Sequence, residues 1–215
     1  MLATATLAPA EERVVLRNIS WQTYQRLLSE TVNVVSTRFF YDEGNLEIMV
    51  VHAGHEWPND TLLDLAKFAA LETIGDFVCT GHMTCIREDL AKGFEPDSSF
   101  YLRRADEVRG RDKIDVAKDP PPELIVEVDI TSSSLNHSPL YAAVGILEIW
   151  RFDGQRVRFH RLEGGEYHEI ELSVALPPMT AAQATIFVER KGHQRAGEWE
   201  RAVRQWIRSR TVASE

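Results

Sequence analysis

Three acidic residues occupy positions where their carboxylates could hold a metal ion. Glu127 and Asp129 lie inside the most apolar run of the chain, ELIVEVDI at residues 123–130. Residues two apart on a strand project from the same face, so these two side chains would form one acidic patch. Asp97 opens another β-rich segment about thirty residues earlier. A buried carboxylate without a partner costs several kcal/mol, and a divalent cation would offset the repulsion between such groups.

Magnesium chemistry fits this pattern of acids. Mg²⁺ binds carboxylate oxygens and keeps several waters, one of which can attack a phosphodiester. The pattern therefore indicates metal-assisted hydrolysis of a phosphate ester. The alternative is structural, because paired acids on a strand often face solvent or pair with arginine, and Glu-Pro-Asp is also common in turns.

The charge of the chain limits how it could meet nucleic acid. The formal net charge is −9 over 215 residues, so no global field attracts DNA. Contact with a phosphate backbone would need a local basic surface, for which the arginine-rich stretch at 193–215 is a candidate. An enzyme whose metal ions supply positive charge at the site is less affected by this balance.

Cysteine content and hydropathy favour a cytoplasmic protein. Cys79 and Cys85 lack further Cys or His at metal-ligand spacing, so we expect reduced thiols and no zinc site. The first ten residues lack the basic start of a signal peptide. No stretch approaches the roughly 20 apolar residues of a membrane span.

The elements that must position these acids alternate between helix and strand. We expect a leader without order at 1–12, one domain at 13–192 and a basic helix at 193–215. The fold class that we predict is α/β (α+β), with a central mixed β-sheet flanked by helices on both faces. The segments on which this prediction depends are a helix after Ser20, a hairpin at 38–51, a long helix at 57–74, strands at 77–79, 83–86, 99–102 and 123–130, a short helix at 139–144, a hairpin at 147–162, a strand at 167–172 and helices at 180–191 and 199–207.

Three blocks in the sequence resemble the Uma-two family of restriction endonucleases, within the PD-(D/E)XK nuclease superfamily. The blocks are GFEPDSSFY at 93–101, DPPPELIVEVDITSSSL at 119–135 and YAAVGILEIWRFD at 141–153. The resemblance implies a restriction endonuclease-like fold that uses Mg²⁺ or Mn²⁺. It implies that Asp97 and Glu127 bind the metal and that Val128 offers its backbone carbonyl. Glu56 is a further candidate, as an acidic ligand or a group that positions water, although an acid near a helix start is also common for dipole reasons.

One position departs from the superfamily pattern. The lysine expected two residues after the second acid is Asp129 here, and the place to which the family often moves that lysine, four residues before Tyr141, is His137. A histidine could act as a general base or carry a proton near a phosphate, or it could be a plain surface residue. Two functions therefore remain open. One is a Mg²⁺-dependent endonuclease that cuts DNA and could act as a homodimer, and the other is a degenerate nuclease fold that binds nucleic acid or protein.

Overall fold

Two β-sheets pack against each other in the computed structural model, which describes residues 11–31, 34, 36–130 and 136–211. The N-terminal sheet is antiparallel, with strand order β1-β3-β2-β6-β5. Its strands are β1 (Glu11–Leu16), β2 (Thr37–Asp42), β3 (Asn45–Val51), β5 (Cys85–Arg87) and β6 (Lys92–Phe94).

The central sheet has the order β11-β10-β9-β8-β7-β4 and is mixed, because β8 and β9 run parallel while the other pairs are antiparallel. Its strands are β4 (Val78–Cys79), β7 (Ser98–Tyr101), β8 (Leu124–Val128), β9 (Glu148–Phe152), β10 (Val157–Glu163) and β11 (Glu166–Ile170). The helices are α1 (Trp21–Glu30), α2 (Ala53–Thr73), the 3-10 turn η1 (Glu88–Leu90), α3 (Ala105–Val108), α4 (Ser138–Val144), α5 (Ala181–Lys191) and α6 (Ala196–Thr211).

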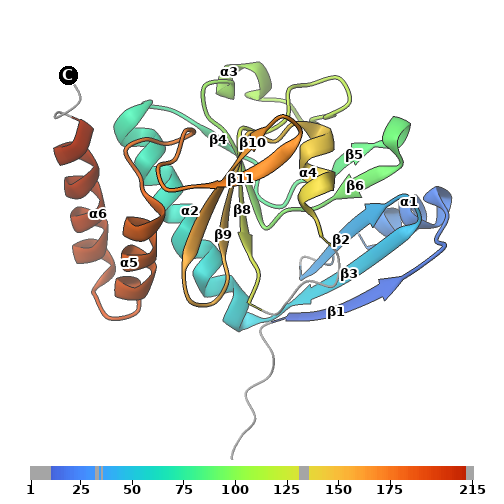
Figure 1. Ribbon diagram of the computed structural model, residues 1–215, viewed down its shortest axis with the longest axis horizontal. Helices are drawn as coiled ribbons and strands as arrows, with labels where there is room; N and C mark the ends of the chain where they lie inside the picture. The colour runs from blue at the N-terminus through green and yellow to red at the C-terminus, as the bar shows by residue number, and fades with distance from the viewer. Residues whose placement is uncertain (1–10, 32–33, 35, 131–135, 212–215) are drawn as a thin grey trace, which may run out of the picture.

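The layers follow from which face of each sheet is apolar. The outer face of the N-terminal sheet packs on α1 through Tyr24, Tyr41 and Leu46. Its inner face shares a core with α4 and with one face of the central sheet, to which Ile125 and Ile149 contribute. The other face of the central sheet carries α2 and α5 over the largest core cluster. Figure 1 shows this succession, with α5 and α6 at one end of the molecule and α1 at the other.

The predicted mixed α/β class is confirmed, and the structure adds features that the sequence did not reveal. The 38–51 hairpin belongs to a separate sheet, so the central sheet has helices on one face and α4 with a second sheet on the other. Helix α2 begins at Ala53 rather than 57 and continues through Pro58. Glu11 and Glu12 of the expected leader belong to β1, while 1–10 and the expected strand break at 131–134 lie outside the described residues.

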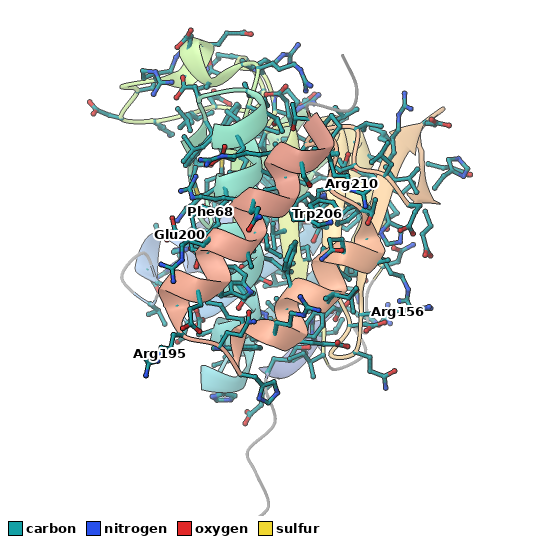
Figure 2. The ribbon with its side chains drawn as sticks, turned by 90° about the vertical axis from the view of Figure 1, so that its left-hand side faces the viewer. Phe68, Arg156, Arg195, Glu200, Trp206 and Arg210 are labelled. Carbon is teal, nitrogen blue, oxygen red and sulfur yellow. The ribbon has the colours of Figure 1, made fainter. Side chains whose placement is uncertain are left out.

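The C-terminal basic helix packs on the body of the protein. Helix α6 buries Trp199, Val203 and Ile207, and it lies beside α5 as Figure 2 shows. Glu72 of α2 binds Arg204 at 2.8 Å and Arg208 at 2.6 Å. These contacts compensate part of the positive charge of α6. Among the described residues, no helix is both long and apolar enough to cross a membrane.

A buried glutamate anchors the chain after β11. The side chain of Glu148 on β9 is fully buried, and its two oxygens accept four hydrogen bonds at 2.6–2.9 Å. The donors are Trp150 Nε1, Ser173 Oγ and the backbone amides of Val174 and Ala175. A buried carboxylate with this many donors is stabilising, because its charge is spread over hydrogen bonds that would otherwise be unmade.

We expect Glu148→Gln to lower the free energy of unfolding by about 2–4 kcal/mol, because an amide turns one acceptor into a donor that faces other donors. Urea unfolding followed by circular dichroism measures the change. Glu166→Gln at an exposed position of β11 is the control and should change stability by less than about 0.5 kcal/mol. Equal stabilities of the two variants would contradict the role assigned to Glu148.

Candidate metal centre between the two sheets

Strand pairing brings Asp97 and Glu127 together. Ser98 of β7 pairs with Val126 of β8, so one further residue in the same register places Asp97 opposite Glu127. Directly opposed residues on antiparallel strands project from the same face, with Cβ atoms about 4.5–5.5 Å apart. Asp97 Oδ2 also accepts a hydrogen bond of 2.8 Å from the backbone amide of Val128. The two carboxylates, distant in sequence, therefore face the same small volume.

The environment of this pair disfavours two negative charges. Glu127 is 5% exposed and Asp97 is 2% exposed. Burial, followed by the charge of Asp97, raises the pKa of Glu127 well above its ordinary value, although a 2.8 Å hydrogen bond from the Tyr141 hydroxyl acts in the opposite direction. Bringing a cation between the carboxylates would remove this repulsion.

The oxygen atoms available here fit a magnesium-type ion. Asp97 Oδ1 is buried and has no hydrogen-bond partner among the described residues, and Arg38 Nε lies 3.8 Å from it. No cluster of three or more His, Cys, Asp or Glu side chains that could hold a metal occurs within the described part of the chain. Mg²⁺ is commonly held by one or two carboxylates with several waters, so the pair is a sufficient protein contribution for that ion.

The Val128 carbonyl, implied as a third ligand, already has a partner. His55 Nε2 donates to it at 3.0 Å and also lies 3.1 Å from Asp97 Oδ2. Burial lowers the pKa of His55, but hydrogen bonding to Asp97 and the charges of Asp97 and Glu11 outweigh burial, so the pKa is raised. His55 therefore holds Asp97 and β8 in position, and the carbonyl oxygen of Val128 keeps one lone pair for another ligand.

Asp129 shares the face of Glu127, as its spacing predicts. Its Oδ1 forms a 2.9 Å ion pair with the guanidinium of Arg13 on β1. Arg13 also binds Glu11 at 3.1 Å and Glu47 at 2.6 Å. Burial raises the pKa of Asp129 even though Arg13 opposes it. The N-terminal sheet thus supplies a guanidinium that links three carboxylates at the edge of the candidate site.

His137 lies inside the site rather than on the surface. The residue precedes the first turn of α4 and is 7% exposed, and its ring stacks on Phe40 with centroids 3.7 Å apart and planes 7° apart. Its Nε2 lies 3.4 Å from Glu47 Oε1, and its Nδ1 lies 3.5 Å from the Tyr141 hydroxyl that binds Glu127. Although burial acts in the opposite direction, hydrogen bonds from His137 and Arg13 lower the pKa of Glu47 to about 2.

Glu56 is the site candidate that stays at the periphery. It is exposed in the first turn of α2, one residue after His55. Its charge reaches His82, whose pKa is lowered by burial and by Arg38 while Asp97 and Glu56 act in the opposite direction. Its position matches an acid near a helix start that the helix dipole favours.

The cavity beside these residues is small. Its volume is about 10 Å³, which is close to the space that one water needs. It is lined by Arg13, Phe40, Met49, Glu127, Val128, Asp129, His137, Tyr141 and Arg151. A wider cavity of about 570 Å³ is lined by residues of α1, β2 and β5 and by Glu95. Glu95 accepts hydrogen bonds there from Thr84 and from the Phe39 amide. Glu95 and Asp97 thus face different places. Among the described residues, Asp97 contacts Val128 and His55, and Glu95 does not.

Several residues of this site gave no functional signal in the sequence. Glu11 belongs to the expected leader at 1–12 and Arg13 opens the expected domain, so sequence analysis assigned neither residue a functional role. Glu47 sits in a hairpin strand whose alternation indicates packing. The only available signal was polarity at inward-facing strand positions, and that requires knowing which face is inward. The further members that sequence analysis did not assign are Arg38, His55, Tyr141 and Arg151.

The fold and this site define a mixed α/β protein with a candidate metal centre built from acids on neighbouring strands. The chain belongs to the Uma2 family, described as "Putative restriction endonuclease", whose profile matches residues 21–186. Four solved chains match, among them the crystal structure of "a putative nuclease belonging to DUF820" from Anabaena variabilis. That chain is 12% identical with a TM-score of 0.45, and the match covers 70% of this chain and 90% of that chain. No match was found among curated proteins.

Glu127→Gln is expected to stabilise the protein in EDTA at pH 8, the opposite of the effect at Glu148. The folded-state pKa of Glu127 is raised, so its contribution to stability is present below the unfolded value and is lost as pH rises. A neutral amide avoids that loss, and the two proteins should be equally stable near pH 4. Thermal unfolding at both pH values measures the difference.

A lower melting temperature for Glu127→Gln than for wild type in EDTA at pH 8 would contradict the assigned electrostatics. Adding Mn²⁺ should then raise the melting temperature of wild type and leave that of the variant nearly unchanged, since binding to the folded state alone stabilises it.

Proposed function

We propose that this protein is a Mg²⁺- or Mn²⁺-dependent endonuclease that hydrolyses DNA phosphodiesters in the cytoplasm. The observation that carries the proposal is that Asp97 and Glu127 lie opposite each other on adjacent strands and are both buried. Within the described part of the chain, Asp97 Oδ1 also lacks a hydrogen-bond partner. Membership of the Uma2 family supports the same chemistry.

The metal ion, when bound, would neutralise charge on the phosphate and acidify a bound water. The carboxylates of Asp97 and Glu127 would hold it, and the Val128 carbonyl would offer a further oxygen. His55 keeps Asp97 Oδ2 in place through its 3.1 Å contact. In the hydrolysis, the oxygen of a water molecule bonds to phosphorus, one ester P–O bond breaks, and the departing oxygen takes up a proton.

The remaining candidates act on protons and water around this pair. Asp129 accepts a proton more readily than an exposed aspartate because burial raises its pKa. His137 is linked to Glu127 through the Tyr141 hydroxyl, so it fixes the orientation of that carboxylate. Glu56 would contribute only through a water. Cutting both strands of DNA would require two copies of the chain or two successive events.

Cleavage of supercoiled plasmid with Mg²⁺ or Mn²⁺ tests the proposal. We expect wild type to cut, and Asp97→Ala and Glu127→Ala each to lower the rate by at least about 10²-fold, because each change removes half of the carboxylate pair. Asp106→Ala, at an exposed position of α3, should cut like wild type. Equal activity of wild type, Asp97→Ala and Glu127→Ala would remove the assignment of both acids.

A second function, a degenerate nuclease fold that binds nucleic acid or protein without cutting, is favoured by the placement of His137. That side chain is stacked on Phe40 and close to Glu47, whereas the family pattern expects a lysine there. A lysine ammonium is a fixed cation that can approach a phosphate, and a buried imidazole is not.

For the degenerate function, we expect wild type to bind duplex DNA without cutting it and His137→Lys to create Mg²⁺-dependent cleavage. His168→Lys, exposed on β11, is the control with the same change of charge and should stay inactive. Cleavage by wild type that depends on Asp97 would exclude this alternative.

A further inference from the structure

Most cations around Asp97 and Glu127 are engaged among the described residues, and Arg38 Nε already lies 3.8 Å from Asp97 Oδ1. Asp129 stands where the superfamily pattern has lysine, His137 is directed at Glu47, and Arg13 already binds three carboxylates. A phosphodiester that approaches Asp97 and Glu127 would bring more negative charge to a place that disfavours it. A positive side chain beside the acids would offset that charge together with a bound metal ion.

Strand β9 places an arginine directly beside Glu127. Strands β8 and β9 are parallel, and their register pairs Glu127 with Arg151. The neighbouring pair Ile125 and Ile149 lies in the core between the sheets, so this register puts paired residues on one face. Adjacent strands are about 4.8 Å apart, and Asp97, Glu127 and Arg151 therefore form one row across three strands.

Arg151 also lines the same cavity as Glu127 and acts electrostatically on the nearby carboxylates. It lines the cavity of about 10 Å³ together with Glu127, Asp129 and Tyr141. Its charge opposes the upward pKa shifts of Glu127 and Asp129, which places the guanidinium within electrostatic reach of both carboxylates.

The guanidinium of Arg151 is not committed to either acid. Its Nε is buried without a hydrogen-bond partner among the described residues, and in that part of the chain no ion pair within 4.0 Å joins it to Glu127 or Asp129. By contrast, Arg158, its partner in register on β10, is bound to Asp153 at 2.9 Å. Arg151 thus has donors available to an incoming anion.

We propose that Arg151 binds the phosphodiester that is to be cut and supplies the fixed positive charge that the missing lysine would supply. This inference rests on the proposed nuclease function and assigns a residue outside the motifs that define it. Two guanidinium N–H groups can hold two non-bridging oxygens of one phosphate, which fixes the phosphorus relative to Asp97 and Glu127. The strand origin of Arg151 makes that geometry rigid.

Salt dependence of DNA binding tests this role without requiring cleavage. The probe is a fluorescein-labelled DNA duplex with Ca²⁺ in place of Mg²⁺, and fluorescence anisotropy gives the Kd between about 50 and 200 mM NaCl. We expect Arg151→Gln to weaken binding roughly tenfold and to reduce the slope of log Kd against log salt by about 1, because one phosphate contact is lost. Arg151→Lys should keep the slope and weaken binding roughly threefold, since it keeps the charge and loses the bidentate geometry.

Arg161→Gln is the matched control, because Arg161 lies on β10 opposite Glu148 and is paired with Glu163. It should bind DNA like wild type. A folded Arg151→Gln variant with the Kd and slope of wild type would overturn the proposal, as would an equal loss in Arg161→Gln. A change confined to the melting temperature would also overturn it, because a purely structural counter-ion would give that result. If Arg151→Gln does not fold, Arg151→Lys decides, and its wild-type Kd would count against the proposal.

Cleavage in Mg²⁺, measured separately on the same variants, distinguishes the two levels of inference. One outcome is that wild type never cuts DNA but Arg151→Gln reduces the slope of log Kd against log salt. That result would refute the nuclease function and support the contact between Arg151 and phosphate. The other outcome is that wild type cuts DNA while Arg151→Gln leaves the Kd and the slope unchanged. That result would support the nuclease function and refute the role of Arg151. A wild type that binds no duplex overturns the role of Arg151 outright.

Discussion

The interior between the two sheets has to accommodate several carboxylates, and their compensation shapes the rest of the site. Glu11 and Glu47 project from the N-terminal sheet toward Asp97 and Glu127 of the central sheet, and all four are at most 5% exposed. Each buried charge costs several kcal/mol unless a partner balances it. Arg13 forms ion pairs with Glu11 and Glu47 and so balances part of this negative charge. Strand β1 is therefore a component of the site.

Two glutamates on neighbouring strands have opposite effects on the stability of the protein. Glu148 accepts four hydrogen bonds and stabilises the junction after β11. Among the described residues, Glu127 accepts a hydrogen bond from Tyr141 and faces another acid, and burial raises its pKa. A protein that retains such a group carries a cost in stability, which a bound cation would offset.

The positive charges around the acids are distributed differently from the pattern that the motifs imply. His137 is held between Phe40 and Glu47, and it reaches Glu127 only through a tyrosine hydroxyl. Arg151 lies beside Glu127 in the next strand, and the described residues include no ion pair between the two. A long cationic side chain on the strand adjacent to the second acid could reach the same phosphate as one located two residues further along the same strand, because both positions lie within about 7 Å of that acid. The chemistry of a phosphate site can thus persist while the residue that supplies the charge moves.

Local patterns in the sequence predict most elements and single out Asp97 and Glu127, whereas the metal-binding role of these two acids follows from the family resemblance and stays a prediction. The alternation in 123–130 fixed β8 and the shared face of Glu127 and Asp129, since side chains on a strand alternate irrespective of what packs on them. What packs against that face was decided only by tertiary structure. Nothing in the local sequence shows that the 38–51 hairpin forms its own sheet, or that β9 runs parallel to β8 and brings Arg151 beside Glu127. Those contacts join residues far apart in the chain, and their free energy depends on long-range pairing and desolvation, which no local pattern encodes.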